Sequence, residues 1–317
     1  MARINLHGIL LLDKPQGLTS TGALARVKRL FNAVKAGHTG TLDPMATGLL
    51  PLCFGEATKF STDLLNADKA YEAVLKLGTT TTTGDAEGAS LEVRPVSVSE
   101  ADIEPVLARL RGPIRQVPPM YSALKRDGKP LYEYARAGIT LEREAREVSI
   151  HRLDLISFAD GLMHLSVDCS KGTYIRTLAE DIGAALGCGA HLVSLRRTRV
   201  GALLLSDAVT LPQLEALAPD ARLAHVLGLD ALLSSLPRVD LEEPLAARFC
   251  QGQRLQLGVA AGPAGEVRVY GPAGLIGLAD RRDDGVLAPS RVIHAGTSPA
   301  GPIPAGAIPA DATQPLI

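Results

Sequence analysis

A loop punctuated by glycine is the feature that most constrains this 317-residue chain; it reads GHTGTLDPMATG from Gly37 to Gly48. Three glycines in twelve residues leave the backbone free to take left-handed or closely approached conformations. Within the loop, Pro44 disfavours the α region for Asp43 and pushes it towards an extended conformation. The loop therefore presents a single carboxylate on a backbone that ordinary residues could not form.

Asp43 is also the first acid after a uniformly basic stretch. The residues from 14 to 42 include no acid and five cations, namely Lys14, Arg26, Lys28, Arg29 and Lys35. A carboxylate behind a basic approach is what an enzyme that modifies a polyanion needs, because cations hold phosphates and the carboxylate reacts. A structural interpretation competes with this one. Asp before Pro is typical of a helix start, with Asp43 as N-cap of a short helix over Met45–Leu50, and spacing alone favours it.

Eight segments, in order along nearly the whole chain, resemble the TruB-type bacterial tRNA pseudouridine synthases. They read GILLLDKPQGLTS (8–20), GHTGTLDPMATG (37–48), KAYEA (69–73), TTGDAEG (82–88), PPMYSALK (118–125), LYEYAR (131–136), KGTYIR (171–176) and AHLVSLRR (190–197). One such segment would be a weak signal. Eight of them in the order of the family make chance a poor explanation.

The resemblance implies three residues at the chemistry. In such enzymes the Asp of the glycine-rich loop is the essential catalytic residue, which here is Asp43. The Tyr of the KxY segment packs on the target base, here Tyr71. The Arg of KGTYIR corresponds to Arg176, which we expect to pair with Asp43 and to hold it ionised, since a nearby cation lowers the pKa of a carboxyl group.

Three more residues are implied on the substrate side. Tyr174 would form an aromatic wall of the pocket, and Leu195 would line it. The loop histidine, His38, would contact the RNA beside the flipped nucleotide. A tyrosine or leucine at such positions also suits ordinary core packing, and a loop histidine also suits hydrogen bonding to the loop backbone. The residues alone leave these alternatives open.

Charge is distributed unevenly although the net charge is only −1. The segment Arg109–Arg136 holds seven basic and two acidic residues, and three of the six tyrosines, Tyr121, Tyr132 and Tyr134, lie within it. Local cations at phosphate positions, with aromatic rings that can stack on bases, favour nucleic-acid binding. We expect the RNA backbone to be contacted by Lys14, Arg115, Lys125 and Arg126.

Composition excludes several other classes. With 46% hydrophobic and 21% charged residues the chain can form globular cores, and no apolar run approaches the roughly 20 residues of a membrane span. The four cysteines and seven histidines are scattered, without the clustered spacing of a metal site. No nucleotide-binding glycine fingerprint occurs. We therefore expect no metal, no cofactor, no membrane association and a cytoplasmic location.

Hydrophobic patterning predicts an α+β fold. Strands are expected at 8–12, 71–78, 148–156 and 162–169, and helices at 20–31, capped by Ser20, at 99–110, capped by Ser99, and at 174–186. By resemblance this is the pseudouridine-synthase fold, a mixed and largely antiparallel sheet. The catalytic domain would span 1–236, with a basic thumb-like insertion at about 112–146. A β-rich module of PUA type would follow at 237–294, and a disordered Pro/Ala/Gly tail at 295–317.

Three functions remain to be weighed. The leading one is a tRNA pseudouridine synthase that isomerises uridine-55 in the TΨC stem-loop, with base flipping, an essential Asp and no obligatory protein partner. The second is a relative that works within a guide-RNA particle on ribosomal RNA. The third is a non-catalytic RNA-binding or RNA-folding protein. The basic insertion favours the stand-alone enzyme, and the joint presence of Asp43, Tyr71 and Arg176 favours catalysis.

Overall fold

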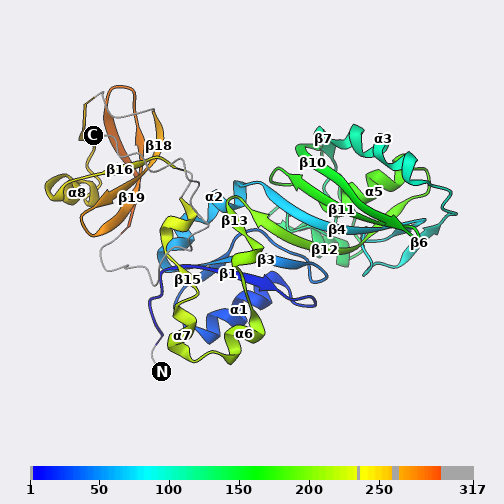
Figure 1. The fold of residues 1–317 in the computed structure, drawn as a ribbon, viewed down its shortest axis with the longest axis horizontal. Coiled ribbons are helices and arrows are strands. Elements are labelled where there is room, and N and C mark those ends of the chain that lie inside the picture. Colours follow the sequence, from blue (N-terminus) through cyan, green and yellow to red (C-terminus); the bar gives the residue numbers. More distant parts are fainter. Residues whose placement is uncertain (1–2, 234–235, 259–263, 294–317) are drawn as a thin grey trace.

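The computed structural model describes residues 3–233, 236–258 and 264–293 (Figure 1). A large sheet of 11 strands forms the body, and a second sheet of five strands forms a module at one end of the molecule. The main path of the large sheet runs β14-β1-β3-β12-β4-β11-β10-β7. Its strands are β1 (Gly8–Lys14), β2 (Ala36–His38), β3 (Thr47–Phe54), β4 (Lys69–Leu77), β7 (Gly112–Gln116), β10 (Arg146–Ala159), β11 (Leu162–Cys169), β12 (Ala190–Val200), β13 (Leu203–Leu204), β14 (Val209–Thr210) and β15 (Val226–Leu227).

The large sheet is mixed and largely antiparallel, as expected. Only the pairs β1–β14 and β3–β12 are parallel. The β3–β12 contact is short, since it joins only Thr47 to Arg196 and Gly48 to Arg197. This short parallel contact joins the half of the sheet built on β1 and β3 to the half built on β4, β11 and β10.

Helices cover the same face of the large sheet in both of its halves. In β1 the side chains alternate, so that Leu10 and Leu12 pack with Val27 of α1 (Ser20–Leu30). In β4, Leu75 belongs to a core that also contains Ile103 of α3 (Glu100–Leu110) and residues of α5 (Ile175–Ala185). The opposite face of β1 packs against the 3₁₀ turn η1 (Gly55–Phe60).

The shorter elements complete the body. They are α2 (Ser61–Asn66), the ribbon β5 (Thr79–Thr81) and β6 (Ser90–Val93), η2 (Leu205–Asp207), α6 (Leu211–Ala216), α7 (Pro219–Leu223) and η3 (Leu229–Leu232). Lys69 is buried at the end of α2, where its ammonium donates to the carbonyls of Leu64, Leu65 and Ala67 at 2.5–3.1 Å. A cation at a helix C-terminus satisfies carbonyls that the helix leaves unpaired.

One competing interpretation and one local expectation are wrong. Residues Met45–Leu50 form no helix, because β3 starts at Thr47 and runs through the apolar residues to Phe54. The N-cap of α1 is Thr19, whose hydroxyl accepts from the amide of Gly22, and not Ser20. Ser20 instead exchanges hydrogen bonds with the backbone of Leu42 at 2.8 and 2.9 Å. The hydroxyl that was expected to cap the helix therefore ties the helix to the glycine-rich loop.

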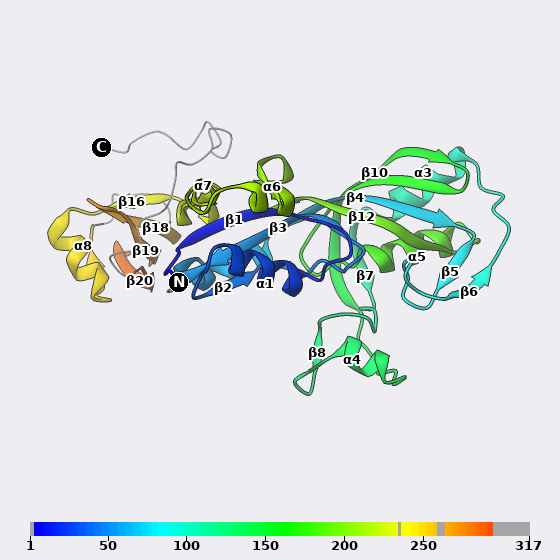
Figure 2. The same ribbon diagram turned by 90° about the horizontal axis from the view of Figure 1, so that it is seen from below.

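The basic insertion projects from the sheet (Figure 2). Its first residues belong to the sheet, since β7 pairs with β10 from Arg146 to Ile150. The chain leaves the sheet after Gln116 and forms the hairpin β8 (Lys125–Arg126) and β9 (Lys129–Pro130), followed by α4 (Leu131–Arg136). The projecting part is therefore shorter than the expected range of about 112–146.

The five-stranded sheet has the order β16-β18-β19-β20-β17. Its elements are β16 (Arg238–Asp240), α8 (Glu243–Cys250), β17 (Leu255–Gln256), β18 (Gly265–Gly271), β19 (Gly274–Arg281) and β20 (Val286–Val292), which confirms the expected β-rich module. Leu278 and Ile293 join the core of Ile9 and Phe60, so the module packs on the body. The tail expected to be disordered lies outside the described residues. None of the helices in the described ranges is long and apolar enough to cross a membrane.

Candidate active site

Strand register brings distant segments into one row across the sheet. Lys14 of β1 lies opposite Gly48 of β3, Gly48 opposite Arg197 of β12, and Arg197 opposite Tyr71 of β4. Residues directly opposite on neighbouring strands point to the same face. The row therefore places three side chains at the junction of the two sheet halves, on the face that carries α1 and α5.

Gly48 is required where β3 meets β12. Its φ is +98°, and a Cβ built there would lie 2.3 Å from the carbonyl oxygen of Arg197. Both the backbone conformation and the close approach exclude a side chain. The close contact fixes the end of the glycine-rich loop against β12.

The loop between β2 and β3 is held by its own backbone. The amide of Thr39 donates to the carbonyl of Pro51, and the amide of Ala46 donates to the carbonyl of Asp43 in a single turn. No helix follows, so the N-cap interpretation of Asp43 is wrong. The carboxylate is free to interact elsewhere.

Asp43 and Arg176 meet as expected. The Nη2 of Arg176 lies 3.0 Å from Oδ2 of Asp43. Arg176 is at the start of α5, and its side chain is 6% exposed, whereas the side chain of Asp43 is 40% exposed. A buried guanidinium thus holds a carboxylate that is still partly exposed to solvent.

Arg176 has further partners that fix its position. Its Nη1 donates to the carbonyl of Thr83 at 3.1 Å, its Nη2 to the carbonyl of Tyr121 at 2.6 Å, and its Nε lies 3.6 Å from Oδ2 of Asp85. Asp85 is buried and accepts from the hydroxyl of Thr83. Asp85 was not assigned a role from sequence, although it lies in the TTGDAEG segment; its carboxylate balances the buried guanidinium.

Electrostatics at Asp43 differ from the expectation. Burial raises the pKa of Asp43 above its usual value, and the guanidinium of Arg176 opposes that rise without cancelling it. The neighbouring carboxylate of Asp85 raises the pKa further. The prediction that Arg176 favours the ionised form is right in direction, but desolvation dominates. An ionised carboxylate in such a site is poorly solvated and hence reactive.

The structure brings the predicted pocket residues to the same region. Tyr71 and Leu195 both pack between the two cores of the body, at the junction of the sheet halves. Tyr174 directly precedes α5, and its backbone amide donates to Oε1 of Gln116 at 3.0 Å. This hydrogen bond fixes the backbone of Tyr174. Burial raises the pKa of both tyrosines, so their hydroxyls are neutral at neutral pH. The region therefore offers aromatic and apolar surface beside one carboxylate.

His38 ends β2, opposite Leu52 of β3. Its Nδ1 is buried and has no hydrogen-bond partner within the protein. Burial and the charge of Arg197 lower the pKa of the imidazole below its usual value, so the ring is neutral at neutral pH. Leaving a buried polar atom without a hydrogen-bond partner costs free energy. The Nδ1 of His38 is therefore available to hydrogen-bond a ligand. The alternative, in which His38 hydrogen-bonds the loop backbone, is not supported at Nδ1, because this atom has no hydrogen-bond partner.

Lys14 is not where an RNA phosphate could reach it. Its side chain is fully buried, and its ammonium donates to the carbonyls of Leu18 at 2.7 Å, Pro15 at 2.9 Å and Pro44 at 3.5 Å. Burial lowers its pKa to about 8. The prediction of a phosphate contact is therefore wrong. Lys14 instead ties the end of β1 to the residue that follows Asp43.

The other three predicted RNA contacts remain accessible. Arg115 is exposed on β7, and Lys125 and Arg126 are exposed on the projecting hairpin. Two tyrosines of the insertion face cations of the same segment, since Lys129 lies 5.0 Å from the ring of Tyr134 and Arg136 lies 5.3 Å from the ring of Tyr132. Tyr121 contributes its carbonyl to Arg176.

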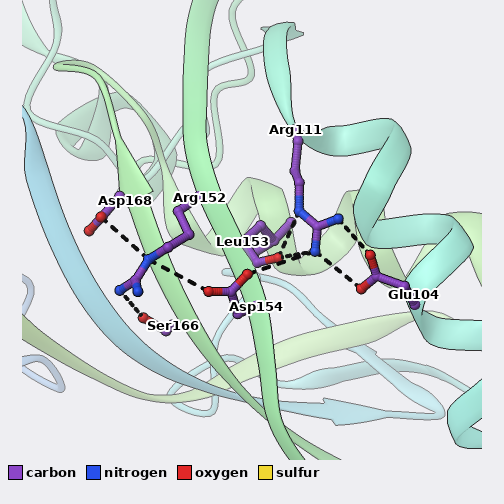
Figure 3. Close-up of polar contacts among 7 residues, drawn as sticks. All are labelled: Glu104, Arg111, Arg152, Leu153, Asp154, Ser166 and Asp168. Carbon is purple, nitrogen blue, oxygen red and sulfur yellow. Dashed lines mark hydrogen bonds and ion pairs between the residues drawn. The ribbon is translucent and has the colours of Figure 1, made fainter.

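Arg152, on the outer face of the sheet opposite the helices, and Arg111, at the end of α3, are both paired. Arg152 lies between Asp154 and Asp168, at 3.6 and 3.5 Å, and donates to the hydroxyl of Ser166 (Figure 3). Arg111 bonds Glu104 and the carbonyl of Leu153. These charges satisfy one another. Within residues 3–233, 236–258 and 264–293, no three His, Cys, Asp or Glu side chains gather closely enough to hold a metal ion.

The chain matches three family models that together cover most of its length. Residues 28–175 match the TruB family pseudouridylate synthase N-terminal domain, residues 176–240 the tRNA pseudouridylate synthase B C-terminal domain, and residues 237–293 the C-terminal domain of pseudouridine synthase II TruB. The three matches follow one another along the chain.

Similar proteins agree with these matches. The chain is 62% identical over 302 residues to the tRNA pseudouridine synthase B of Burkholderia mallei (strain NCTC 10247), covering 93% of the chain and 100% of the relative. It is 58% identical over 305 residues to that of Ralstonia pickettii (strain 12J), covering 92% and 96%. Among solved structures, a Cbf5-Nop10-Gar1 complex contains a chain with a TM-score of 0.70 and 25% identity, covering 94% of this chain and 88% of that one. Sequence, fold and the matched models agree that this chain belongs to the TruB family of pseudouridylate synthases.

Proposed function

We propose that the protein is the tRNA pseudouridine-55 synthase of its cell and that Asp43 is its catalytic carboxylate. The observation that carries the proposal is the contact between Asp43 and the buried Arg176 at 3.0 Å, on a loop fixed at both ends. The relatives with 58–62% identity are tRNA pseudouridine synthases, which supports tRNA as the substrate.

The reaction needs little beyond this site. Isomerisation breaks the bond between the ribose and N1 of the uracil and joins the same base through C5, so no group donor or redox partner is consumed. A carboxylate must act on the ribose, at C1′ or C2′, or on the base at C6. Asp43, poorly solvated and partly exposed, suits each of these roles.

The remaining residues would hold the base. Tyr71 offers a stacking face, and Tyr174 and Leu195 offer further walls for a uracil that is detached from the ribose. A uridine inside a folded loop must first leave its stack, which costs a few kcal/mol. His38, with its unpartnered Nδ1, is suited to take the place of the flipped nucleotide.

The exposed cations of the insertion would grip the tRNA backbone. Within the described residues, Arg115 on β7 and Lys125 and Arg126 on the hairpin form no ion pair, and exposed cations without acidic partners favour binding of a polyanion. We further propose that residues 1–236 form the catalytic domain and 237–294 a PUA-like RNA-binding domain, and that the protein works in the cytoplasm.

The test is the release of tritium from tRNA labelled at C5 of uridine, with purified protein and no guide RNA. We expect release from the TΨC loop and pseudouridine at position 55. Release only after addition of a guide RNA would favour a role in a guide-RNA particle. Two similar solved structures, a Cbf5-Nop10-Gar1 complex and an H/ACA RNP bound to a substrate RNA, are the reason to include this outcome. Tight tRNA binding without any release would favour an RNA-folding protein.

A further inference from the structure

Gln116 is the last residue of β7, where the chain leaves the sheet for the projecting insertion (Figure 2). Alternation along the strand places Ile114 and Gln116 on the core side and Arg115 on the solvent side. Gln116 is only 2% exposed. A buried side-chain amide needs partners for both its donor and its acceptor, and each partner is fixed by the contact.

Both partners of this amide belong to one residue, Tyr174. The Oε1 of Gln116 accepts from the backbone amide of Tyr174 at 3.0 Å, and its Nε2 donates to the carbonyl of Tyr174 at 3.3 Å. Tyr174 is the N-cap of α5, and its own side chain makes no capping hydrogen bond. Gln116 therefore fixes the backbone where α5 begins, although it lies 58 residues away in the sequence.

Arg176 lies in the first turn of that helix, directly after Ile175. Its guanidinium also contacts the segment that follows Gln116, because Nη2 donates to the carbonyl of Tyr121 at 2.6 Å. The same nitrogen lies 3.0 Å from Oδ2 of Asp43. The backbone that carries Arg176 and the guanidinium at its end are thus both held by residues 116–121.

The other two partners of Arg176 restrain only the end of its side chain. The carbonyl of Thr83 and the carboxylate of Asp85 lie on the loop between β5 and β6 and contact the guanidinium. Within the described residues, only Gln116 contributes side-chain hydrogen bonds to the backbone of Tyr174. Loss of the Gln116 amide would therefore release the start of α5 while the guanidinium keeps its other contacts.

We propose that Gln116 is a positioning residue, which holds the start of α5 so that the guanidinium of Arg176 meets the carboxylate of Asp43. This inference rests on the proposed function, because it assigns to Gln116 a part in the chemistry of Asp43 and not in folding alone. The rate of an enzyme is sensitive to such placement, since a displacement of about 1 Å caused by a distant mutation can slow the reaction about a hundredfold.

The first experiment is a double-mutant cycle on the single-turnover rate of pseudouridine formation at saturating tRNA. Gln116→Met keeps the length of the side chain and removes both hydrogen-bonding groups. We expect it to slow the reaction about ten- to hundredfold, with little change in tRNA affinity, because the displaced group is Arg176 and not a cation that grips the RNA. In the Arg176→Met background the same change should have a much smaller effect. Equal effects in both backgrounds would overturn the proposal, since Gln116 would then act independently of Arg176.

The second experiment needs neither RNA nor activity, so it separates a failure of this inference from a failure of the proposed function. It follows the carboxyl carbon of Asp43 by ¹³C NMR as the pH is varied, with Asp43→Asn to assign the signal. Arg176 and Lys14 oppose the rise in the pKa of Asp43, and Asp85 adds to it. Gln116→Met introduces no charge and leaves Lys14 and Asp85 in the chain, so a guanidinium that has moved away should make Asp43 titrate at higher pH. An unchanged titration would overturn the proposal.

Gln213→Met is the matched control for both experiments. Gln213 also fixes the start of a helix through its side-chain amide, since its Oε1 accepts from the backbone amide of Thr210, the N-cap of α6, at 2.9 Å. That helix packs on α1 and β1. We expect its reaction rate and the titration of Asp43 to match those of the unchanged protein.

Thermal unfolding of every variant shows whether the fold survives. Where Gln116→Met is unfolded, Gln116→Asn takes its place, because it keeps a neutral amide but withdraws it from Tyr174 by one methylene group. The expected results, a slower reaction that depends on Arg176 and a titration of Asp43 at higher pH, are the same. A folded Gln116→Asn with normal rate and normal titration would overturn the proposal.

Discussion

Asp43 is held by a cation yet buried enough to resist ionisation. Its pKa lies above the usual value because desolvation outweighs the guanidinium of Arg176. In the proposed mechanism the reaction needs the ionised carboxylate, so we expect the rate to fall as the pH falls through this raised pKa. Removing the opposing cation must raise the pKa further.

Arg176→Met should therefore move the acid limb of the single-turnover rate to higher pH, besides lowering its plateau. The measurement is the rate of pseudouridine formation across the acid range, with Arg152→Met as the control, since Arg152 lies on the outer face. A lower plateau with an unmoved limb would mean that Arg176 does not act on the ionisation of Asp43.

Gly48 offers a second test at the scale of single residues. Alanine there would meet the Arg197 backbone at 2.3 Å and would also have to take a φ of +98°. Gly187 has a φ of +79° with open space around it, so Gly187→Ala measures the conformational cost alone, about 1–2 kcal/mol. We expect Gly48→Ala to lower the free energy of urea unfolding clearly more than Gly187→Ala. Equal losses would show that the close approach to β12 does not matter.

Single residues also mark the limit of sequence reasoning. Asp43, Tyr71 and Arg176 each lie in a segment that resembles the family, and the structure places them around one junction. The burial of Lys14 was not predictable, because a lysine in a basic stretch looks exposed until three carbonyls converge on it. The contacts of buried Arg197 with the carbonyls of Gly40 and Leu49 depend on the pairing of β12 with β3, which no local pattern shows.

At the scale of elements, the insertion is the part that projects from the sheet and carries exposed cations (Figure 2). Each lost phosphate contact lowers the slope of log affinity against log salt by about 0.7 to 0.9. Neutralising Arg115, Lys125 and Arg126 together should thus weaken tRNA binding and flatten its salt dependence. The control is neutralisation of Arg152, whose charge is paired on the outer face (Figure 3). A slope that changes only in the control would place the tRNA on that outer face.

Helices and strands whose sequence shows a clear hydrophobic period or a capping residue were predicted well. The capping box of Ser99 and Asp102 marks α3, and the alternation in 162–169 marks β11. The segment after Asp43 was harder, because its apolar run suits a buried strand as well as a short helix. The strand partners of this segment decide the outcome. β3 pairs over seven residues with β1, which is distant in sequence, and also with β2. Only tertiary pairing distinguishes the two.

At the scale of the whole molecule, the C-terminal module is fixed to the body through apolar contacts. Leu278 is fully buried in a core shared with Ile9 and Phe60. Arg291 pairs with Asp63 at 2.8 Å across the same interface, with both side chains about one-third exposed. Burial of apolar side chains contributes more than a partly exposed ion pair, which is worth about 1 kcal/mol at most.

Leu278→Ala should therefore cost about 2–5 kcal/mol of unfolding free energy, and Arg291→Ala about 1 kcal/mol or less. Urea unfolding followed by circular dichroism measures both. The opposite ranking would mean that the ion pair, and not the apolar core, holds the module to the body.

The proposed chemistry depends on one carboxylate, that of Asp43, at the junction of the two halves of the sheet. Asn in place of Asp43 keeps the shape and removes the charge, while Arg176 retains Asp85, Thr83 and Tyr121 as partners. Because the pKa of Asp43 is raised in the folded protein, its ionised form costs stability at neutral pH, so Asp43→Asn should unfold at the same temperature or higher.

The most direct measurement is pseudouridine formation at position 55 by Asp43→Asn under single-turnover conditions, with tRNA affinity and thermal unfolding measured on the same protein. For Asp43→Asn we expect no detectable product, near-normal tRNA affinity and an intact fold. Product formed at a near-normal rate would contradict it, and the chemistry would have to be assigned to another group.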